Sequence, residues 1–365
     1  LQFAVEEGLN RAVTEWKAAS ATAIMMDPFT GEILAMASRP TYDPNNPSVS
    51  EIPERRNRAI TDTYEPGSTF KLVAAAGVLE SGLVDTETKF DCSAGKMKIN
   101  GMTIQDVHKK GVLTFREVIQ TSSNVGTVMA ATRLGNKLYD FAGRFGFGKR
   151  TGVDLPGEAR GKTKPPREWS GTTLPAMAMG YEVSVTPLQV LRAYSAIANG
   201  GFLVRPHVVS RVFSPGGGVV YEFKAEKTER IISKAVADTL REILISVTEK
   251  GGTASEASID GNRVAGKTGT SKLLEGGRYT KKYASSFVGF VPADDPKVAL
   301  IVVVSEPKGQ YYGGLVAAPI FKDIAERTLS YLNVPRDDTF EKNTLVVRAN
   351  SVRSLKEVIP KVEGN

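Results

Sequence analysis

The sequence predicts a mixed α/β (α+β) fold in which a single antiparallel sheet is built from both ends of the chain. Strand-like segments occur near the beginning and again in the final third, while helical patterns dominate the middle. Because a sheet must bury its apolar faces against other elements, we expect helices to flank it and the central helices to form a middle subdomain. The expected strands are 22–27, 31–38, 264–270, 285–292 and 297–305.

Residues 1–18 carry apolar side chains at helical spacing, which predicts an amphipathic helix. The two strands that follow are joined by a turn at 27–31, where Pro and Gly stand at positions that suit a hairpin loop. Residues 39–63 are rich in Pro, Asn and Arg, which predicts a long surface loop. This loop leads to the first stretch of the chain that carries chemistry.

Helical patterns return at 113–134, where Thr114 suits the N-cap and Glu117 completes a capping box. Three small polar residues at 122–124 interrupt this pattern, because such side chains compete for backbone hydrogen bonds in a helix interior. We therefore expect two helices joined by a turn. Further helices are expected at 137–145, 186–199, 233–248 and 317–332, and strands at 203–223 around a Ser-Pro-Gly turn.

The chain has 365 residues, of which 41% are hydrophobic and 24% are charged, as in ordinary globular proteins. We expect residues 1–332 to form one domain, and the polar stretch 333–365 to be a tail or a truncated linker. No run of residues is long and apolar enough for a transmembrane helix, and no signal peptide opens the sequence. The net charge is +7, but the basic residues are scattered and lack interleaved aromatics, which argues against a nucleic-acid partner.

The single cysteine, Cys92, excludes an internal disulfide. Since there are also only two histidines, a tetrahedral zinc site of Cys and His is not expected, and we predict no metal and no cofactor. His108 and His207 stand outside any recognisable motif, and both are predicted to lie at the surface. A Ser-His-Asp hydrolase would need one of these two histidines as its base, so their lack of a motif argues against that class of enzyme.

The stretch from Glu65 to Lys71 reads Glu-Pro-Gly-Ser-Thr-Phe-Lys and precedes an apolar run of helix-forming residues. A helix that begins near Ser68 brings Lys71 onto the same face, because residues three apart are neighbours on a helix. This helix is apolar nearly all round, which predicts that it is buried. Burial lowers the pKa of a lysine, so Lys71 is a candidate general base that activates Ser68 as a nucleophile.

Two later clusters are candidates for the remaining parts of an acyl-transfer site. Ser122 can relay a proton between Lys71 and the leaving or incoming amine. Asn124 can orient both a substrate amide and Lys71, since a carboxamide donates and accepts hydrogen bonds.

The second of these clusters, Lys267-Thr268-Gly269-Thr270, predicts an edge strand beside the nucleophile. Lys267 supplies positive charge, and the hydroxyl groups of Thr268 and Thr270 suit a substrate carboxylate. Gly269 is expected to leave room for a substrate backbone. We expect the backbone N–H groups of Ser68 and Thr270 to form an oxyanion hole.

With these motifs in this order, the sequence resembles the transpeptidase domain of class B penicillin-binding proteins of the division, elongation or sporulation type. The resemblance implies a serine β-lactamase/transpeptidase-like fold and extends from about residue 1 to residue 332. It rests on the three clusters and on the segments Asp27–Met36, Arg56–Ala59, Gln120–Gly126, Gly146–Gly148, Asp154–Glu158 and Tyr312–Gly314.

The resemblance implies that Ser68 attacks the penultimate D-alanine carbonyl of a peptidoglycan stem peptide, releases the terminal D-alanine and passes the acyl group to the amine of a neighbouring stem. Lys267, Thr268 and Thr270 would hold the terminal carboxylate of the donor, and β-lactam antibiotics would acylate Ser68 as donor mimics. The resemblance also implies a site of action outside the cytoplasmic membrane, a partner glycosyltransferase, and an N-terminal membrane anchor and pedestal domain that this sequence does not contain.

Three other activities share this fold and its motifs: a D,D-carboxypeptidase, a β-lactamase and a non-catalytic β-lactam sensor. A β-lactamase needs a base that deacylates the enzyme rapidly, and Glu158 and Glu168 are candidates in the irregular segment before residue 174. The rate of deacylation separates a β-lactamase from a transpeptidase or a sensor. Residues 272–282, rich in Gly and Lys, are expected to form a mobile loop beside the acceptor side of the site.

Overall fold

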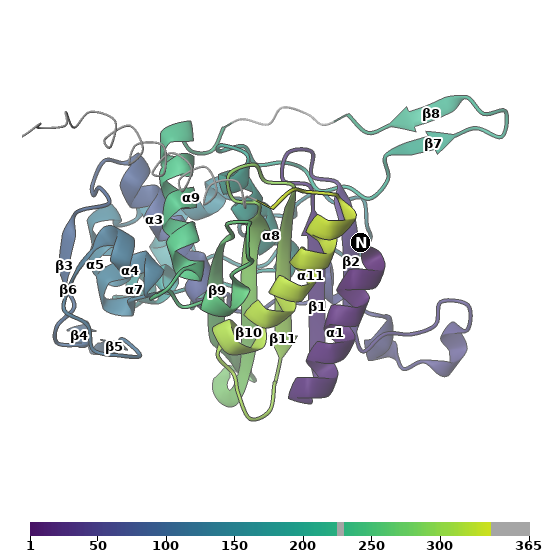
Figure 1. Cartoon of the computed structure of the whole chain (residues 1–365). Coiled ribbons are helices and arrows are strands. Elements are labelled where there is room, and N and C mark those ends of the chain that lie inside the picture. Colours follow the sequence, from purple (N-terminus) through teal and green to yellow (C-terminus); the bar gives the residue numbers. More distant parts are fainter. Residues whose placement is uncertain (225–229, 337–365) are drawn as a thin grey trace, which may run out of the picture.

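The computed structural model describes residues 1–224 and 230–336. Its centre is a five-stranded antiparallel sheet with the strand order β2-β1-β11-β10-β9 (Figure 1). Two strands come from the beginning of the chain and three from its final third, so the predicted assembly of the sheet from both ends is confirmed. The strands are β1 (Ser20–Met26), β2 (Ile33–Arg39), β9 (Ala265–Glu275), β10 (Arg278–Val291) and β11 (Val298–Ser305).

Helices cover both faces of the sheet, and side chains alternate between the faces with the period of two that a strand imposes. On one face, Met25 and Leu300 belong to a cluster with the helices α1 (Gln2–Trp16) and α11 (Ala318–Tyr331). On the other face, their neighbours along the strands pack into a larger cluster that includes α8 (Pro187–Ala198). Because β1 and β11 are covered on both sides, they are nearly continuous apolar runs.

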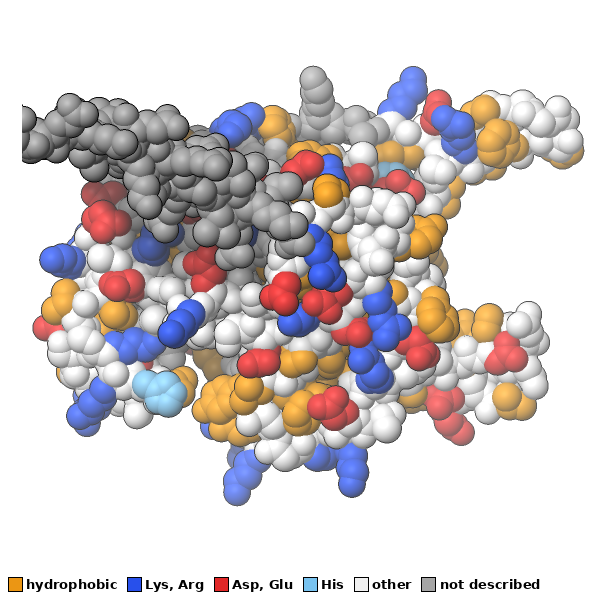
Figure 2. Space-filling model, viewed as in Figure 1, with side chains coloured by type: hydrophobic (Ala, Val, Ile, Leu, Met, Phe, Trp, Pro, Cys, Tyr) orange, Lys and Arg blue, Asp and Glu red, His pale blue; other side chains and the backbone are white. Residues whose placement is uncertain are grey.

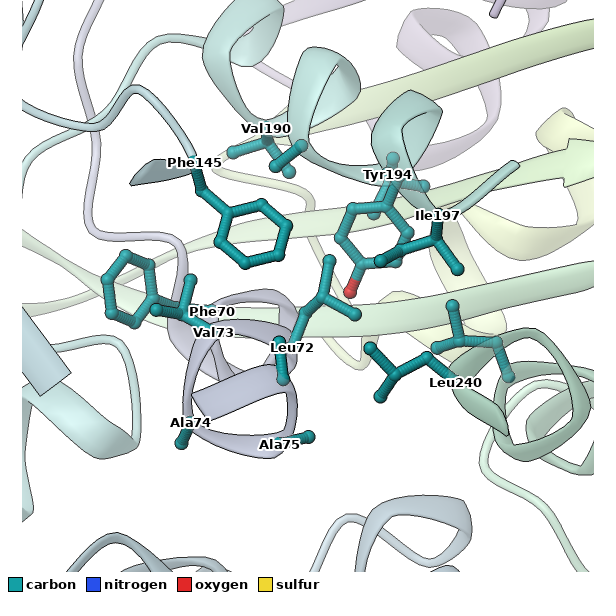
Figure 3. Packing of buried hydrophobic residues seen from close by; sticks show 14 of the residues in the cluster. Phe70, Leu72, Val73, Ala74, Ala75, Phe145, Val190, Tyr194, Ile197 and Leu240 are labelled. Atoms are coloured by element: carbon teal, nitrogen blue, oxygen red, sulfur yellow. The ribbon is translucent and has the colours of Figure 1, made fainter. Parts of the chain in front are cut away.

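The middle of the chain forms a helical subdomain around α3 (Lys71–Glu80), as predicted. Residues 71–78 of this helix are all buried, because a helix that is apolar all round needs neighbours on every side. Figure 3 shows Leu72 packed in one cluster with Phe145 and Tyr194, which come from two other segments of the chain. The other helices of this region are α4 (Phe115–Gln120), α5 (Asn124–Leu134), α6 (Lys137–Arg144), α7 (Thr173–Ala178) and α9 (Lys234–Thr248).

The predicted helix start at Thr114 is confirmed by its cap geometry. The Thr114 hydroxyl accepts a hydrogen bond from the backbone N–H of Glu117, and the Glu117 carboxylate accepts one from the N–H of Thr114. The remaining short elements are the helices α2 (Arg58–Thr61) and α10 (Gly313–Val316), and the paired strands β3 (Lys89–Asp91) with β6 (Val112–Thr114) and β4 (Lys96–Ile99) with β5 (Met102–Gln105).

Two segments differ from the predictions. Within 203–223, the strands predicted around the Ser-Pro-Gly turn are present but shorter than expected. They are β7 (Arg211–Phe213) and β8 (Val219–Glu222), which form a hairpin that projects from the body of the molecule (Figure 1). Residues 272–282, expected to be a loop, instead continue β9 and β10 into a hairpin. The two glycines at its turn, 276 and 277, both have positive φ, which a two-residue hairpin turn requires.

The predicted tail, 333–365, lies outside the described residues from 337 onward. Within the two described ranges, no helix is both long and apolar enough to cross a lipid bilayer. On the face seen in Figure 2, basic and acidic side chains are interspersed rather than gathered in a patch of one sign.

Candidate active site

Ser68 lies in a short 3₁₀ helix, Gly67–Phe70, that runs directly into α3. The backbone N–H of Lys71 donates to the carbonyl of Ser68, which closes one tight turn between the two residues. Gly67 has a φ of 54°, a conformation that glycine adopts without steric cost. Ser68 is half-buried and Lys71 is completely buried, so the hydroxyl and the amine stand where the surface meets the core.

Oxygen atoms from the cluster around Ser122 and Asn124 surround the amine of Lys71. Its Nζ lies 2.8 Å from the carbonyl oxygen of Ser122, 2.7 Å from Oδ1 of Asn124 and 3.2 Å from Oγ of Ser122. Burial lowers the pKa of Lys71 well below its ordinary value, and the positive charge of Lys267 lowers it further. A neutral amine has two N–H groups and one lone pair. The two shortest contacts use both N–H groups and leave the lone pair available to a hydroxyl hydrogen.

The junction between α4 and α5 presents these oxygens to Lys71. Ser122 has a φ of 56°, which is uncommon for a residue with a side chain, and its carbonyl accepts from the amine. Ser123 then caps α5, because its hydroxyl accepts from the backbone N–H of Gly126 at 3.0 Å. The turn predicted from residues 122–124 is therefore confirmed.

Asp106 holds this junction in place, and reasoning from the sequence did not identify it. Its buried carboxylate accepts hydrogen bonds from Oγ of Ser123 at 2.7 Å and from the backbone N–H groups of Asn124 and Val125. The negative charge complements the positive N-terminal end of α5. No local motif marks Asp106, so only the fold brings it to this place.

The cluster Lys267-Thr268-Gly269-Thr270 lies on β9, which is an edge strand of the sheet, as predicted. Lys267 is completely buried, and its amine contacts only the two oxygens of Thr268 among the described residues, at 3.4 and 3.5 Å. Burial lowers the pKa of Lys267 to about 7, and the positive charge of Lys110 contributes to this shift. The Thr270 hydroxyl accepts from the backbone N–H of Gly313 at 2.9 Å, so its own hydrogen is free to donate.

Strand β9 is in direct contact with the Ser68 turn. A Cβ atom placed on Gly67 would lie 3.1 Å from the carbonyl oxygen of Thr270, and one placed on Gly269 would lie 2.9 Å from the carbonyl oxygen of Pro66. The carbonyl of Thr270 therefore faces the turn, and its N–H points the same way, since both groups of one strand residue lie on one edge. The three clusters thus meet at one place.

The expectation that Gly269 leaves room for a substrate backbone is corrected by the structure. The space that its side chain would occupy is filled by the protein itself, by Ser286 at 2.4 Å, Pro66 at 2.9 Å and Thr69 at 3.0 Å. The absence of a side chain lets the strand approach the nucleophile turn, and it does not clear space for a substrate on that side.

Comparison with known proteins agrees with this geometry. The family model for the penicillin-binding protein transpeptidase domain matches residues 21–326. The chain belongs to this family. This transpeptidase domain is 37% identical over 337 residues to the probable peptidoglycan D,D-transpeptidase PenA of Neisseria flavescens, covering 92% of this chain and 81% of PenA.

It is also 38% identical over 352 residues to the peptidoglycan D,D-transpeptidase FtsI of Escherichia coli (strain K12). That match covers 95% of this chain and 58% of FtsI, so the chain spans less than two thirds of that relative. Among solved structures, penicillin-binding protein 3 of Mycobacterium tuberculosis complexed with aztreonam superposes with a TM-score of 0.85 at 34% identity. The superposition covers 92% of this chain and 78% of the other.

The two carboxylates considered as deacylating bases have different surroundings. Glu158 is buried and accepts hydrogen bonds from the backbone N–H and the hydroxyl of Thr151, both at 2.6 Å. Glu168 is exposed in a short 3₁₀ helix, beside Arg167. Within residues 1–224 and 230–336, neither carboxylate makes a hydrogen bond to Ser68.

The prediction that both histidines are exposed is right for His108 and wrong for His207. The backbone of His207 pairs with the N-terminal hairpin, donating to Gly31 and accepting from Ile33. Its ring stacks on Phe223 with the ring centroids 3.5 Å apart. This pairing between distant segments buries a residue whose local sequence is that of a loop.

Proposed function

We propose that this domain is a serine D,D-transpeptidase that cross-links peptidoglycan. The observation that carries the proposal is the buried amine of Lys71, held by Ser122 and Asn124 within one turn of Ser68. Burial lowers the pKa of Lys71 and so favours the uncharged amine, which can accept the Ser68 proton as the hydroxyl attacks a carbonyl. PenA and FtsI, which share 37% and 38% identity with the domain, are named as peptidoglycan D,D-transpeptidases.

In the acylation step, Oγ of Ser68 forms a bond to the penultimate D-alanine carbonyl carbon while its proton passes to Nζ of Lys71. The tetrahedral intermediate then breaks its C–N bond, and the terminal D-alanine leaves with a proton relayed from Lys71 through Oγ of Ser122. In the second step, the amine of a neighbouring stem attacks the ester and gives up its proton by the same route. The Ser68 oxygen regains a proton, and a new amide joins the two stems.

The backbone N–H groups of Ser68 and Thr270 are the proposed oxyanion hole. The first N–H groups of a helix lack partners within the helix, and Ser68 lies in such a first turn. The Thr270 carbonyl faces the same turn, and its N–H lies on the same edge of β9. Removal of one such donor typically costs about 10²–10³ in rate.

Lys267, Thr268 and Thr270 are the proposed site for the terminal carboxylate of the donor. The Lys267 amine has only long contacts with Thr268 in the described part of the chain, so a carboxylate would supply the partner that it lacks. That partner would also raise the pKa of Lys267 from about 7 and keep the ammonium charged.

By the same assignment, β-lactams acylate Ser68 as donor mimics, in line with the aztreonam complex of the related penicillin-binding protein 3. The stem peptides that the domain would use lie outside the cytoplasmic membrane, and we place its action there. A membrane anchor and a partner glycosyltransferase would belong to a longer protein of which this domain is a part.

The hydrogen bonds that occupy the buried carboxylate of Glu158 favour a slowly deacylating enzyme over a β-lactamase. A D,D-carboxypeptidase would pass the acyl group to water, and a sensor would keep it. A donor peptide that ends in D-Ala-D-Ala, mixed with an amine acceptor, separates these alternatives: a transpeptidase yields the cross-linked peptide, a carboxypeptidase yields the shortened donor, and a sensor yields neither.

Mass spectrometry after incubation with benzylpenicillin tests the nucleophile. We expect one penicillin adduct on the peptide that contains Ser68, with a lifetime of hours. Ser68→Ala should abolish the adduct, while Ser48→Ala, at an exposed serine, should retain it. An adduct that survives Ser68→Ala would refute the assignment, and an adduct lost within minutes would indicate a β-lactamase.

A further inference from the structure

A third lysine, Lys110, stands beside the site on its helical side. It lies in the segment between β5 and β6 and is half-buried. Its Nζ donates to the carbonyl oxygen of Thr121 at 2.9 Å, and Thr121 immediately precedes Ser122. The ammonium is also close enough to Lys71 and Lys267 for its charge to lower the pKa of both. Lys110 therefore lies next to the residue whose carbonyl and hydroxyl oxygens contact Lys71.

A structural role as a helix cap accounts for only one of the hydrogen bonds that the Lys110 ammonium can donate. The carbonyl of Thr121 follows the last residue of α4, where helix carbonyls lack partners and a lysine can cap them. That bond uses one of the three N–H groups of the ammonium. Within the described residues, no carboxylate oxygen lies within 4 Å of Lys110. Asp106, whose charge does reach it, is already hydrogen-bonded to three groups of the α4–α5 junction.

The electrostatic balance at this place is therefore positive. The positive charges of Lys110 and Lys267 repel each other, and Asp106, the carboxylate whose charge reaches Lys110 among the described residues, is hydrogen-bonded at the helix junction. A partly desolvated cation without an anionic partner is unfavourable, and neighbouring charges of one sign attract ligands of the opposite sign. A bound carboxylate would give Lys110 an anionic partner and would offset the excess of positive charge.

We propose that Lys110 forms an anion subsite for the peptide substrate, where its ammonium binds a carboxylate that lies away from the scissile bond. This subsite is distinct from the place for the terminal carboxylate, because Lys110 stands on the helical subdomain beside Ser122 while Lys267 stands on β9. The inference rests on the proposed transpeptidase function. A second carboxylate could belong to the donor stem or to the acceptor stem, and the chemistry of recognition is the same.

Two pairs of synthetic peptides test the subsite. In the first pair, a donor that ends in D-Ala-D-Ala carries an internal carboxylate or the matching carboxamide. In the second pair, the acceptor carries the same change. We expect the wild-type domain to prefer the carboxylate in one pair by about tenfold or more in kcat/KM, mostly through KM, as charge-assisted hydrogen bonds allow. The pair that shows the preference identifies the stem that is bound.

In Lys110→Met the preference should fall close to one, and Lys110→Arg should restore most of it. Lys109→Met removes an exposed neighbouring charge and should keep the wild-type preference. The inference is overturned if wild type prefers neither carboxylate, if Lys110→Met keeps the preference, or if Lys109→Met removes it equally. The inference is also overturned if Lys110→Met lowers the melting temperature and slows the reaction of all peptides equally. Only the helix-capping role of Lys110 would then remain.

The same samples separate this inference from the proposed function. A wild-type domain that forms a penicillin adduct and cross-links peptides without any carboxylate preference refutes the subsite alone. A wild-type domain that forms no adduct and turns over no peptide refutes both.

Discussion

Two completely buried lysines belong to the candidate active site, one on a helix and one on a strand, and their surroundings differ. Lys71, on α3, has three oxygen atoms within 3.2 Å, all supplied by Ser122 and Asn124. Lys267, on β9, has only two long contacts within the described residues, both to Thr268. Burial is the main cause of the lowered pKa in both.

Burial of a lysine therefore does not by itself define its role, because the number of nearby hydrogen-bond acceptors differs between the two sites. On the helical side, the acceptors are already in place, so a neutral amine is fully satisfied and its lone pair can take a proton. On the strand side, the acceptors are lacking, so an ammonium there gains most from an anionic ligand. Four substitutions or conditions test this contrast between the two lysines, and the strongest expected effect is described first.

Lys71→Ala removes the proposed base, and we expect the rate of acylation by a fluorescent penicillin to fall by about 10²–10⁴, the usual contribution of a general base. The domain should still fold, because the substitution removes a buried polar group together with its desolvation cost. Rapid-quench labelling and circular dichroism measure the two quantities. Lys272→Ala, at an exposed lysine of β9, is the matched control. An unchanged rate in Lys71→Ala would show that another base operates.

Lys267→Met removes the charge proposed to bind the terminal carboxylate of the donor. We expect kcat/KM for a D-Ala-D-Ala donor to fall by about 10–100-fold, the range for a hydrogen bond to a charged group. A donor with its terminal carboxylate amidated should lose much less in the same variant. An equal loss for both donors would mean that Lys267 does not read the carboxylate.

Gly269→Ala tests the contact between the two sides of the site. A Cβ at this position would meet a backbone oxygen of Pro66 at 2.9 Å and the side chain of Ser286 at 2.4 Å. We expect a loss of about 1–3 kcal/mol in the free energy of unfolding, as for other overpacked sites, and slower acylation as the strand moves off the turn. Gly143→Ala, in α6 with open space around it, should instead stabilise by about 0.5–1 kcal/mol. Equal stability changes in the two variants would contradict the contact.

The free energy of unfolding should rise as the pH is raised from 7 to 9. Lys267 has a pKa of about 7 in the folded state and about 10.4 when unfolded, so in this range the unfolded state binds more protons and stability increases with pH. One such group contributes at most about 1.4 kcal/mol per pH unit. Urea unfolding at several pH values measures the slope, which Lys267→Met should reduce. A slope that is flat or negative in the wild-type domain would contradict the pKa of Lys267.

Residues that are close in sequence were predicted well. The pairing of Ser68 with Lys71 depends only on helical spacing, and the turn at 122–124 depends on side chains that disfavour a helix interior. The edge position of the Lys267 strand and the assembly of the sheet from both chain ends also followed from local patterns and their order. The hairpin at 272–282 was missed, because its polar composition masked the two glycines that permit a tight turn.

The local sequence therefore specifies the reactive groups and the backbone conformation that presents each of them. Which groups meet depends on the fold. Asp106 holds the Ser122 junction, Lys110 lies beside it, His207 is buried, and Gly269 lets its strand approach Pro66. The physical reason is that desolvation and hydrogen bonding at these places come from segments distant in the chain. A local pattern fixes spacing and conformation, whereas the number of oxygen atoms around a buried amine depends on what folds against it.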